Sequence, residues 1–148
     1  MIRESILIVD DNADDIFITR KASTNSRPDS FIEHAANGCE ALDFLRKGSV
    51  PAMIFLDYKM PGMSGIDVLQ QIRKRGETRY IPVVMLTSSN FESDMKAAYD
   101  AGANSYLTNT FNLGIFMEEI KTVLNLLGII PRSLLRLSYF SMHERIYL

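Results

Sequence analysis

Short apolar runs alternate with amphipathic segments along most of the chain, and this alternation limits the possible folds more than any other feature. The five runs cover residues 5–9, 30–35, 52–56, 81–86 and 104–108. The first, third and fourth runs are continuously apolar and rich in branched residues, which is typical of parallel strands covered on both faces. The second run contains polar residues, so we expect it nearer an edge of the sheet.

Segments with helical periodicity separate the runs, and capping residues mark their ends. We predict helices over residues 13–25, 38–47, 65–75, 91–101 and 112–127. The expected N-caps are Asp11 or Asn12, Asn37, Ser64, and Ser89 or Asn90, whereas Gly48, Gly76, Gly102 and Gly128 are expected to end four of the helices. One face of the last helix, which we expect to cover the sheet, carries Ile115, Phe116, Ile120, Val123, Leu124 and Leu127.

Strands that alternate with helices predict an α/β fold, a doubly wound (βα)5 parallel sheet of five strands with flavodoxin-like architecture. The chain has 148 residues, 47% of them hydrophobic, which is enough for one domain, predicted at residues 1–128. Residues 129–148 form an apolar basic extension in which Pro131 suits the first turn of a helix. Packing in a homodimer is our leading interpretation of this extension, and the alternatives are folding back on the domain, an acidic partner and a membrane surface.

Composition excludes several classes of protein. The formal net charge is −2, which supplies no overall basic field for binding nucleic acid. No run approaches the roughly 20 apolar residues that a membrane-spanning helix needs, so we expect no integral membrane segment. Cys39 is the single cysteine and no signal pattern opens the sequence, so the expected location is cytoplasmic.

Acidic residues follow two of the predicted strands. Asp10 and Asp11 come directly after the first strand, and Asp57 comes directly after the third. Because the site of an open α/β sheet lies at the carboxyl ends of its strands, these carboxylates are expected to converge and to repel one another. A hard cation such as Mg²⁺, held by carboxylates, waters and a phosphate oxygen, would neutralise them and suits phosphoryl chemistry. The alternative for Asp10 and Asp11, and our interpretation of Asp14 and Asp15, is capping of the next helix.

Hydroxyl groups follow the fourth strand at the same expected edge of the sheet. Thr87 is placed to donate a hydrogen bond to a phosphoryl oxygen, whereas Ser88 and Ser89 fit either that role or a helix cap. Tyr106, in the last strand, is interpreted as an aromatic residue of the sheet edge when it is taken alone.

Four segments together resemble the receiver domain of bacterial two-component response regulators. They are ILIVDDN (6–12), FLDYKMPGMSG (55–65), PVVMLTS (82–88) and AGANSYLT (101–108). The resemblance covers about residues 6–127, and the compact DNADD start looks most like the stand-alone, single-domain receivers. The resemblance implies a signalling protein rather than an enzyme, one that assists its own Mg²⁺-dependent phosphorylation and dephosphorylation.

Carried over by motif position, the resemblance implies that Asp57 is the phosphoacceptor for a phosphohistidine on a histidine kinase or phosphotransfer protein. Asp11, Asp57 and the backbone carbonyl of Lys59 would ligate Mg²⁺ directly, and Asp10 would act through a bound water. Signalling would then pass through protein contacts to a downstream protein target.

The resemblance also implies a switch, in which Thr87 hydrogen-bonds the phosphoryl group and Tyr106 follows it inward. One position departs from the family pattern, because Asn109 stands where receivers nearly always have a lysine. An amide can donate hydrogen bonds but supplies no charge, and charge-assisted bonds are about twice as strong. Lys59 is either a substitute cation or, in the interpretation that we favour, a solvated loop lysine.

Two classes of function follow from these residues. The first is the phosphoacceptor switch, and the second is a receiver-fold interaction module in which Asn109 weakens or abolishes coupling to phosphorylation. A phosphatase with Asp57 as nucleophile usually needs a second acid two positions later, where this chain has Lys59. A flavin-binding protein would need a phosphate loop rich in glycine and hydroxyl groups in place of the acidic residues 10–15.

Overall fold

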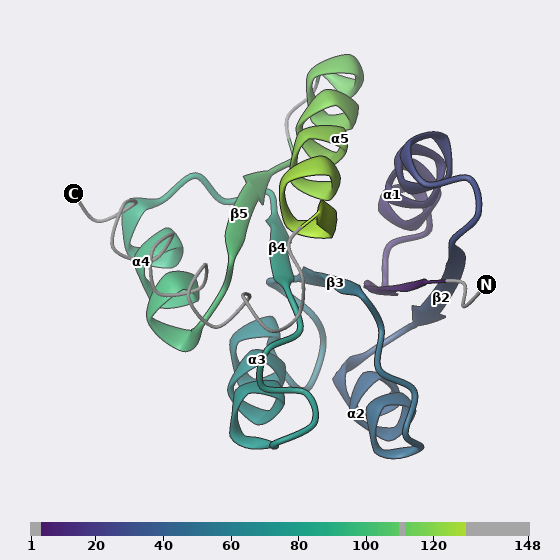
Figure 1. Ribbon diagram of the computed structural model, residues 1–148. Coiled ribbons are helices and arrows are strands. Elements are labelled where there is room, and N and C mark those ends of the chain that lie inside the picture. Colours follow the sequence, from purple (N-terminus) through teal and green to yellow (C-terminus); the bar gives the residue numbers. More distant parts are fainter. Residues whose placement is uncertain (1–3, 110–111, 130–148) are drawn as a thin grey trace.

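The computed structural model describes residues 4–109 and 112–129, and the structural statements below concern those residues. One parallel sheet holds the strands in the order β2-β1-β3-β4-β5, and helices cover both of its faces (Figure 1). The strands are β1 (Ser5–Val9), β2 (Phe31–Ala35), β3 (Met53–Asp57), β4 (Val83–Thr87) and β5 (Ser105–Thr108). The helices are α1 (Ala13–Ser26), α2 (Gly38–Arg46), α3 (Gly65–Lys74), α4 (Glu92–Ala101) and α5 (Leu113–Ile129). The predicted α/β fold is therefore confirmed.

Two apolar cores hold the layers together, one on each face of the sheet. Side chains alternate along each strand, so Leu7 of β1 joins the core that contains α2, α3 and α4. Its neighbour Ile8 joins the core formed with Ala22 of α1 and Phe116 of α5. The central strands β1, β3 and β4 are buried on both faces, as their continuous apolar runs predict, whereas β2 lies at the edge and exposes Phe31.

The strand register brings the ends of the central strands to one level. Val9 pairs with Leu56, so the residues after them, Asp10 and Asp57, follow neighbouring strands side by side. Asp57 in turn pairs with Leu86 of β4, which places Thr87 at the same edge. The sheet therefore gathers the acidic and hydroxyl residues that the sequence singles out.

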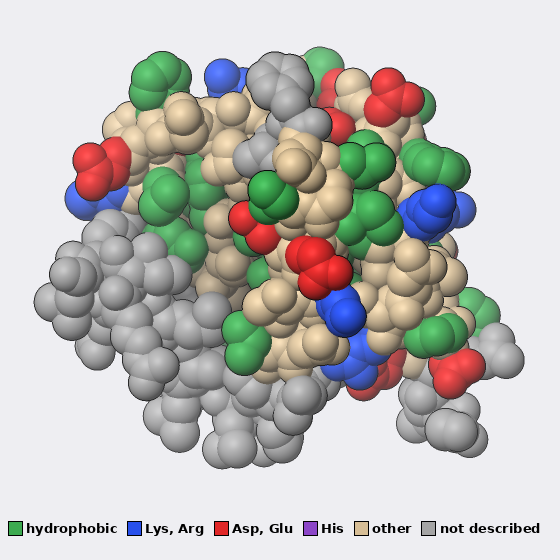
Figure 2. Space-filling model, turned by 90° about the horizontal axis from the view of Figure 1, so that it is seen from above, with side chains coloured by type: hydrophobic (Ala, Val, Ile, Leu, Met, Phe, Trp, Pro, Cys, Tyr) green, Lys and Arg blue, Asp and Glu red, His purple; other side chains and the backbone are tan. Residues whose placement is uncertain are grey.

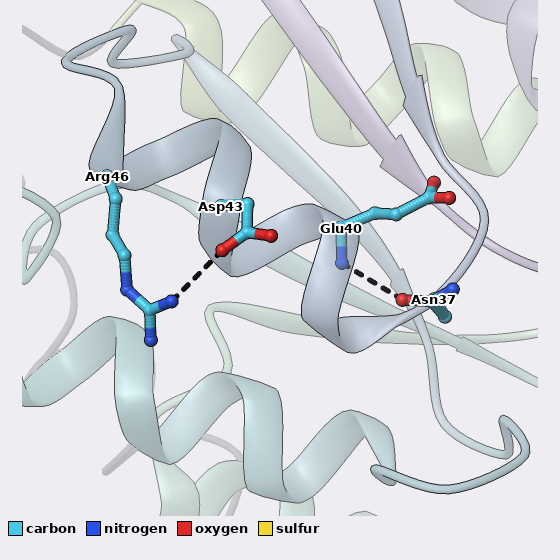
Figure 3. A network of polar contacts seen from close by, with 4 residues as sticks. All are labelled: Asn37, Glu40, Asp43 and Arg46. Atoms are coloured by element: carbon cyan, nitrogen blue, oxygen red, sulfur yellow. Dashed lines mark hydrogen bonds and ion pairs between the residues drawn. The ribbon is translucent and has the colours of Figure 1, made fainter.

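Three of the predicted N-caps are confirmed. The side chains of Asn12, Asn37 and Ser64 each accept a hydrogen bond from the backbone N–H three residues later. Figure 3 shows this bond for Asn37 at the start of α2, where its length is 2.9 Å. Gly48 and Gly102 follow the ends of α2 and α4 with φ of +91° and +110°, left-handed values that favour glycine.

Helix α4 begins differently from the prediction. Its N-cap is Phe91, which makes no side-chain capping bond. The Ser89 hydroxyl donates instead to the Asp94 carboxylate at 2.5 Å. The predicted caps Ser89 and Asn90 are therefore wrong, because α4 begins later: Ser89 Oγ accepts from the N–H of Phe91, the residue before the first helical residue.

Other predicted helix features also need correction. Helix α3 ends just before Arg75, whose backbone is extended, so Gly76 does not end it. Helix α5 continues through Gly128, and a glycine inside a helix costs only about 1 kcal/mol. Ile115 is 52% exposed, so it lies outside the buried stripe of α5, whereas the other five predicted residues of that stripe are buried.

The predicted extension lies almost entirely at residues 130–148, outside the described residues, and so does its predicted helix. None of the helices within residues 4–109 and 112–129 has both the length and the apolar character that crossing a bilayer requires. Acidic, basic and apolar side chains are interspersed on the face seen in Figure 2, and the described part of that face shows no continuous basic patch.

Gly65 lies where the loop between β3 and α3 packs against the end of β3. A Cβ atom added there would collide with the Asp57 carbonyl oxygen and would lie 3.0 Å from Tyr58 Cα, and neither backbone atom can turn away. We therefore expect Gly65→Ala to lower the free energy of unfolding, measured in urea, by about 1–3 kcal/mol. Gly76→Ala is the matched control, because open space surrounds that position, and it should lose no stability. Equal stability of the two variants would contradict this close packing.

Candidate functional site

Carboxylates from β1 and β3 converge at the carboxyl edge of the sheet. Carboxylate oxygens of Asp10, Asp11 and Asp57 all lie within 4.8 Å of one another. Asp10 is only 2% exposed, Asp57 is half-buried and Asp11 is exposed. They line a cavity of about 210 Å³. Lys59, Thr87 and Asn109, which the sequence also singles out, line the same cavity.

Asp10 is fixed in place by backbone and side-chain bonds. Its backbone N–H donates to the Ala35 carbonyl at 3.1 Å, and its carbonyl accepts from His34 Nε2 at 3.0 Å. Its carboxylate Oδ1 accepts from the Asn12 backbone N–H at 2.9 Å. This buried carboxylate therefore cannot move away from its neighbours.

The acidic cluster is electrostatically unfavourable without a cation. Burial, together with the nearby charge of Asp10, raises the pKa of Asp57 to about 7. Burial and the charges of Asp15 and Asp11 raise the pKa of Asp10 to about 6, although a bond from the Asn12 backbone opposes this shift. All of the converging ligand atoms are oxygens, and the cavity has room for water, so the site fits a hard divalent cation such as Mg²⁺.

The loop after Asp57 keeps its carboxylate oriented. The Tyr58 N–H donates to the Leu86 carbonyl at 2.9 Å, and the Lys59 N–H donates to Asp57 Oδ1 at 3.3 Å. The Lys59 side chain is exposed, and among the described residues it forms no ion pair. Because Lys59 also lines the cavity, the solvated loop lysine and the substitute cation both stay predictions.

Thr87 and Tyr106 are connected through one residue. Thr87 is buried, and its Oγ1 accepts from the Ser89 N–H at 2.9 Å. The Tyr106 hydroxyl donates to the Ser89 carbonyl at 3.0 Å. Tyr106 lies on the edge strand β5, as expected, yet it is buried beside the site, and its ring packs edge-on against Tyr58 with centroids 6.4 Å apart.

Asp15 is a site residue that the sequence analysis missed. It was interpreted as a helix cap, yet the cap is Asn12, and Asp15 lines the cavity. Its Oδ1 accepts a hydrogen bond from Asn109 Nδ2 at 2.7 Å. Asn109 is also held by its backbone N–H, which donates to the Thr87 carbonyl at 2.6 Å. The only sequence feature that points to Asp15 is its place as an acid at the third helical position. That feature does not identify a site residue, because such acids usually bond to their own helix terminus.

The acidic cluster makes stability depend on pH. Because the folded protein raises the pKa of Asp57, the charge of Asp57 does not lower the free energy of unfolding below its ordinary pKa of 3.8. Above that pH the loss of stability grows, and it is complete above about 7. In metal-free buffer, Asp57→Asn should therefore raise the unfolding temperature, and the gain should be larger at pH 8 than at pH 5. Asp14→Asn, which removes an exposed charge from the first turn of α1, should not show this gain. Equal gains at both pH values would contradict the raised pKa of Asp57.

Known proteins share this fold. The response regulator receiver domain family model matches residues 6–121. The probable methanogenesis regulatory protein FilR2 of Methanothrix harundinacea (strain 6Ac) is 37% identical over 124 residues, covering 78% of this chain and 80% of that protein. The phosphorylated cyanobacterial phytochrome response regulator RcpA superposes with a TM-score of 0.80 at 30% identity, covering 86% of this chain and 96% of its own. The Mn²⁺-bound response regulator Rcp1 gives 0.77 at 28% identity, with coverage of 86% and 97%. The chain therefore belongs to the response regulator receiver domains of two-component systems.

Proposed function

We propose that this receiver domain is a Mg²⁺-dependent phosphoacceptor and that Asp57 is the acceptor. A carboxylate oxygen of Asp57 attacks the phosphorus of a phosphohistidine on a histidine kinase or phosphotransfer protein. The P–N bond breaks, and the imidazole leaves with that electron pair and takes up a proton. The observation that carries this proposal is the half-buried Asp57 carboxylate, which lines an open cavity together with Asp10, Asp11 and Thr87. Phosphoryl transfer needs positioning and charge neutralisation more than covalent help from side chains.

We propose Asp11, Asp57 and the Lys59 carbonyl as direct ligands of Mg²⁺, with Asp10 acting through a water. Bound there, Mg²⁺ would neutralise the charge that develops on the phosphoryl oxygens. Asp10 suits the outer role because its Oδ1 is already engaged by the Asn12 N–H. Two similar receivers support this proposal, since RcpA is described in its phosphorylated form and Rcp1 with Mn²⁺ bound.

The proposed switch runs from Thr87 through Ser89 to Tyr106. The Thr87 hydroxyl oxygen accepts from Ser89 N–H, and its proton, which interacts with the Tyr106 hydroxyl, would turn to a phosphoryl oxygen. Movement of Thr87 toward that oxygen would pull on Ser89, whose carbonyl holds the Tyr106 hydroxyl. Phosphorylation would therefore change the packing of Tyr106 and the surface around β5.

We propose a cytoplasmic signalling protein rather than a turnover enzyme, with the receiver domain at residues 1–128. Its partners would be a histidine kinase or phosphotransfer protein and a downstream protein target. The extension at residues 129–148 would pack in a homodimer.

A second candidate is an interaction module with weakened or absent coupling to phosphorylation. The observation that favours it is Asn109, which replaces the usual lysine and whose amide nitrogen is already bonded to Asp15. The cluster of Asp10, Asp11 and Asp57 argues against it, because burying repelling carboxylates without a cation costs stability.

The phosphoacceptor role predicts a modification that depends on Asp57. After incubation with Mg²⁺ and phosphoramidate, intact mass should increase by one phosphoryl group, and Asp57→Asn should abolish the increase. EDTA should also abolish it, whereas Asp14→Asn should leave it unchanged because that side chain is exposed outside the cavity. No Mg²⁺-dependent mass increase with any small phosphodonor would remove the switch and favour the interaction module.

The neutral side chain at position 109 predicts weak transmission of the phosphorylation signal. Asn109→Lys should strengthen phosphorylation-dependent partner binding, because an ammonium group bonds a phosphoryl oxygen more strongly than an amide does. The underlying surface change can be measured by NMR, in which beryllofluoride should shift the amides around Tyr106 further in the variant than in the wild type. Equal shifts in the two proteins would contradict this prediction.

A further inference from the structure

In four of the described helices, α1 to α4, the third helical residue is an acid. The acids of α2 and α3 bond at their own helix terminus, whereas Asp94 of α4 accepts from the Ser89 hydroxyl and Asp15 of α1 has a more distant partner. In α3, the Asp67 carboxylate accepts from the Ser64 N–H and completes a capping box. In α2, whose cap is drawn in Figure 3, the Glu40 carboxylate accepts from the Ala36 N–H at 2.8 Å. Asp15 holds the same position in α1, yet its carboxylate bonds to a side chain that follows β5.

The reason for the difference lies in Asp10. In α1 the backbone N–H of the N-cap Asn12 already donates to Asp10 Oδ1 at 2.9 Å, so no donor remains there for Asp15. The Asp15 carboxylate instead lines the cavity of about 210 Å³ and accepts from Asn109 Nδ2. Asp15 is therefore released from capping by the same residue that builds the acidic cluster.

The bond to Asp15 determines which end of the Asn109 amide lies by the acids. An asparagine amide has an oxygen that only accepts and a nitrogen with two N–H donors. A carboxylate partner at 2.7 Å requires the nitrogen, and it uses one of the two protons. The bond to Asp15 leaves the second N–H of this amide for another acceptor, and Asn109 lines the cavity that also contains Asp57. The hydrogen bond from the Asn109 backbone N–H to the Thr87 carbonyl fixes the position of the Asn109 backbone, from which the side-chain amide extends.

We propose that Asp15 is a positioning residue that orients the Asn109 amide, so that its second N–H donates to a phosphoryl oxygen on Asp57. This inference rests on the proposed phosphoacceptor function and assigns Asp15 a role within it. The oriented amide thereby supplies part of the stabilisation of the phosphoryl group that a lysine would supply through its charge. The arrangement has a cost, because Asp15 adds a fourth carboxylate to a cavity that must accept an anion.

Two substitutions of Asp15 separate orientation from charge. Asp15→Asn removes the charge but keeps an oxygen that can accept from Asn109, whereas Asp15→Ala removes both. Beryllofluoride, the probe for the phosphoryl group, is titrated in saturating Mg²⁺ and followed by NMR of the amides next to Asp57. We expect Asp15→Asn to bind it about fivefold more tightly than Asp15→Ala, because one hydrogen bond is worth about 1 kcal/mol. Asp14→Ala is the matched control on the same helix turn and should match the wild type.

The difference in beryllofluoride affinity between Asp15→Asn and Asp15→Ala must disappear when Asn109 is absent. In an Asn109→Ala background the two Asp15 variants should bind beryllofluoride equally, since a positioning residue acts only through its partner. A second readout does not depend on phosphorylation at all. The side-chain amide signals of Asn109 in a ¹⁵N spectrum, assigned by their loss in Asn109→Ala, should move in Asp15→Ala and stay in place in Asp14→Ala.

The outcomes distinguish this inference from the proposed function. Equal affinities of Asp15→Asn and Asp15→Ala, or a difference that persists without Asn109, would overturn the role of Asp15 while leaving the phosphoacceptor intact. Unchanged Asn109 amide signals in Asp15→Ala would also overturn it. Failure of the wild type to bind beryllofluoride would overturn the proposed function and, with it, this role.

Discussion

The pairing of β1 with β3 forces carboxylates together at the centre of the molecule. Val9 lies opposite Leu56 in the sheet, so Asp10 and Asp57 extend side by side from neighbouring strands. Apolar residues such as Ile8 and Phe55, fully buried on these strands, stabilise the pairing, and burial of each such side chain contributes about 1.5–3 kcal/mol. The carboxylates therefore stay together in the folded state, where burial, together with neighbouring carboxylate charges, raises the pKa of both Asp10 and Asp57. The fold itself creates the demand for a cation at this edge.

The same sheet connects the acidic cluster to more distant side chains. β4 lies next to β3, and the loop after β4 links Thr87 through Ser89 to the Tyr106 hydroxyl. The loop after β5 returns Asn109 to the cavity, where its backbone N–H donates to the Thr87 carbonyl. The cavity that contains Asp57 is thus connected through Thr87 and Ser89 to β5, and through Asn109 to α1.

Much of the fold and of the acidic cluster can be predicted from the sequence, because both depend on local patterns. Continuous apolar runs identify buried parallel strands, and the residues that follow those runs must meet at one edge of the sheet. The role of Asp15 depends instead on whether another residue has already satisfied the donor at the helix terminus, and Asp10 does so only in the folded chain. Ser89 likewise lies before the start of α4 rather than capping it, and its hydroxyl donates to Asp94 while accepting from the Phe91 N–H. Spacing along the chain contains neither fact.

We propose above all that a divalent cation binds and neutralises the repelling, partly protonated carboxylates at the ends of β1 and β3. Calorimetric titration of Mg²⁺ near pH 6.5, repeated in buffers of different ionisation enthalpy, tests this most directly. Because the pKa values of Asp10 and Asp57 are raised to about 6 and about 7, Mg²⁺ should displace protons at this pH. We predict one bound Mg²⁺, with proton release that disappears at pH 8.5 and is reduced in Asp57→Asn. No Mg²⁺ binding, or binding without proton release near pH 6.5, would contradict the claim.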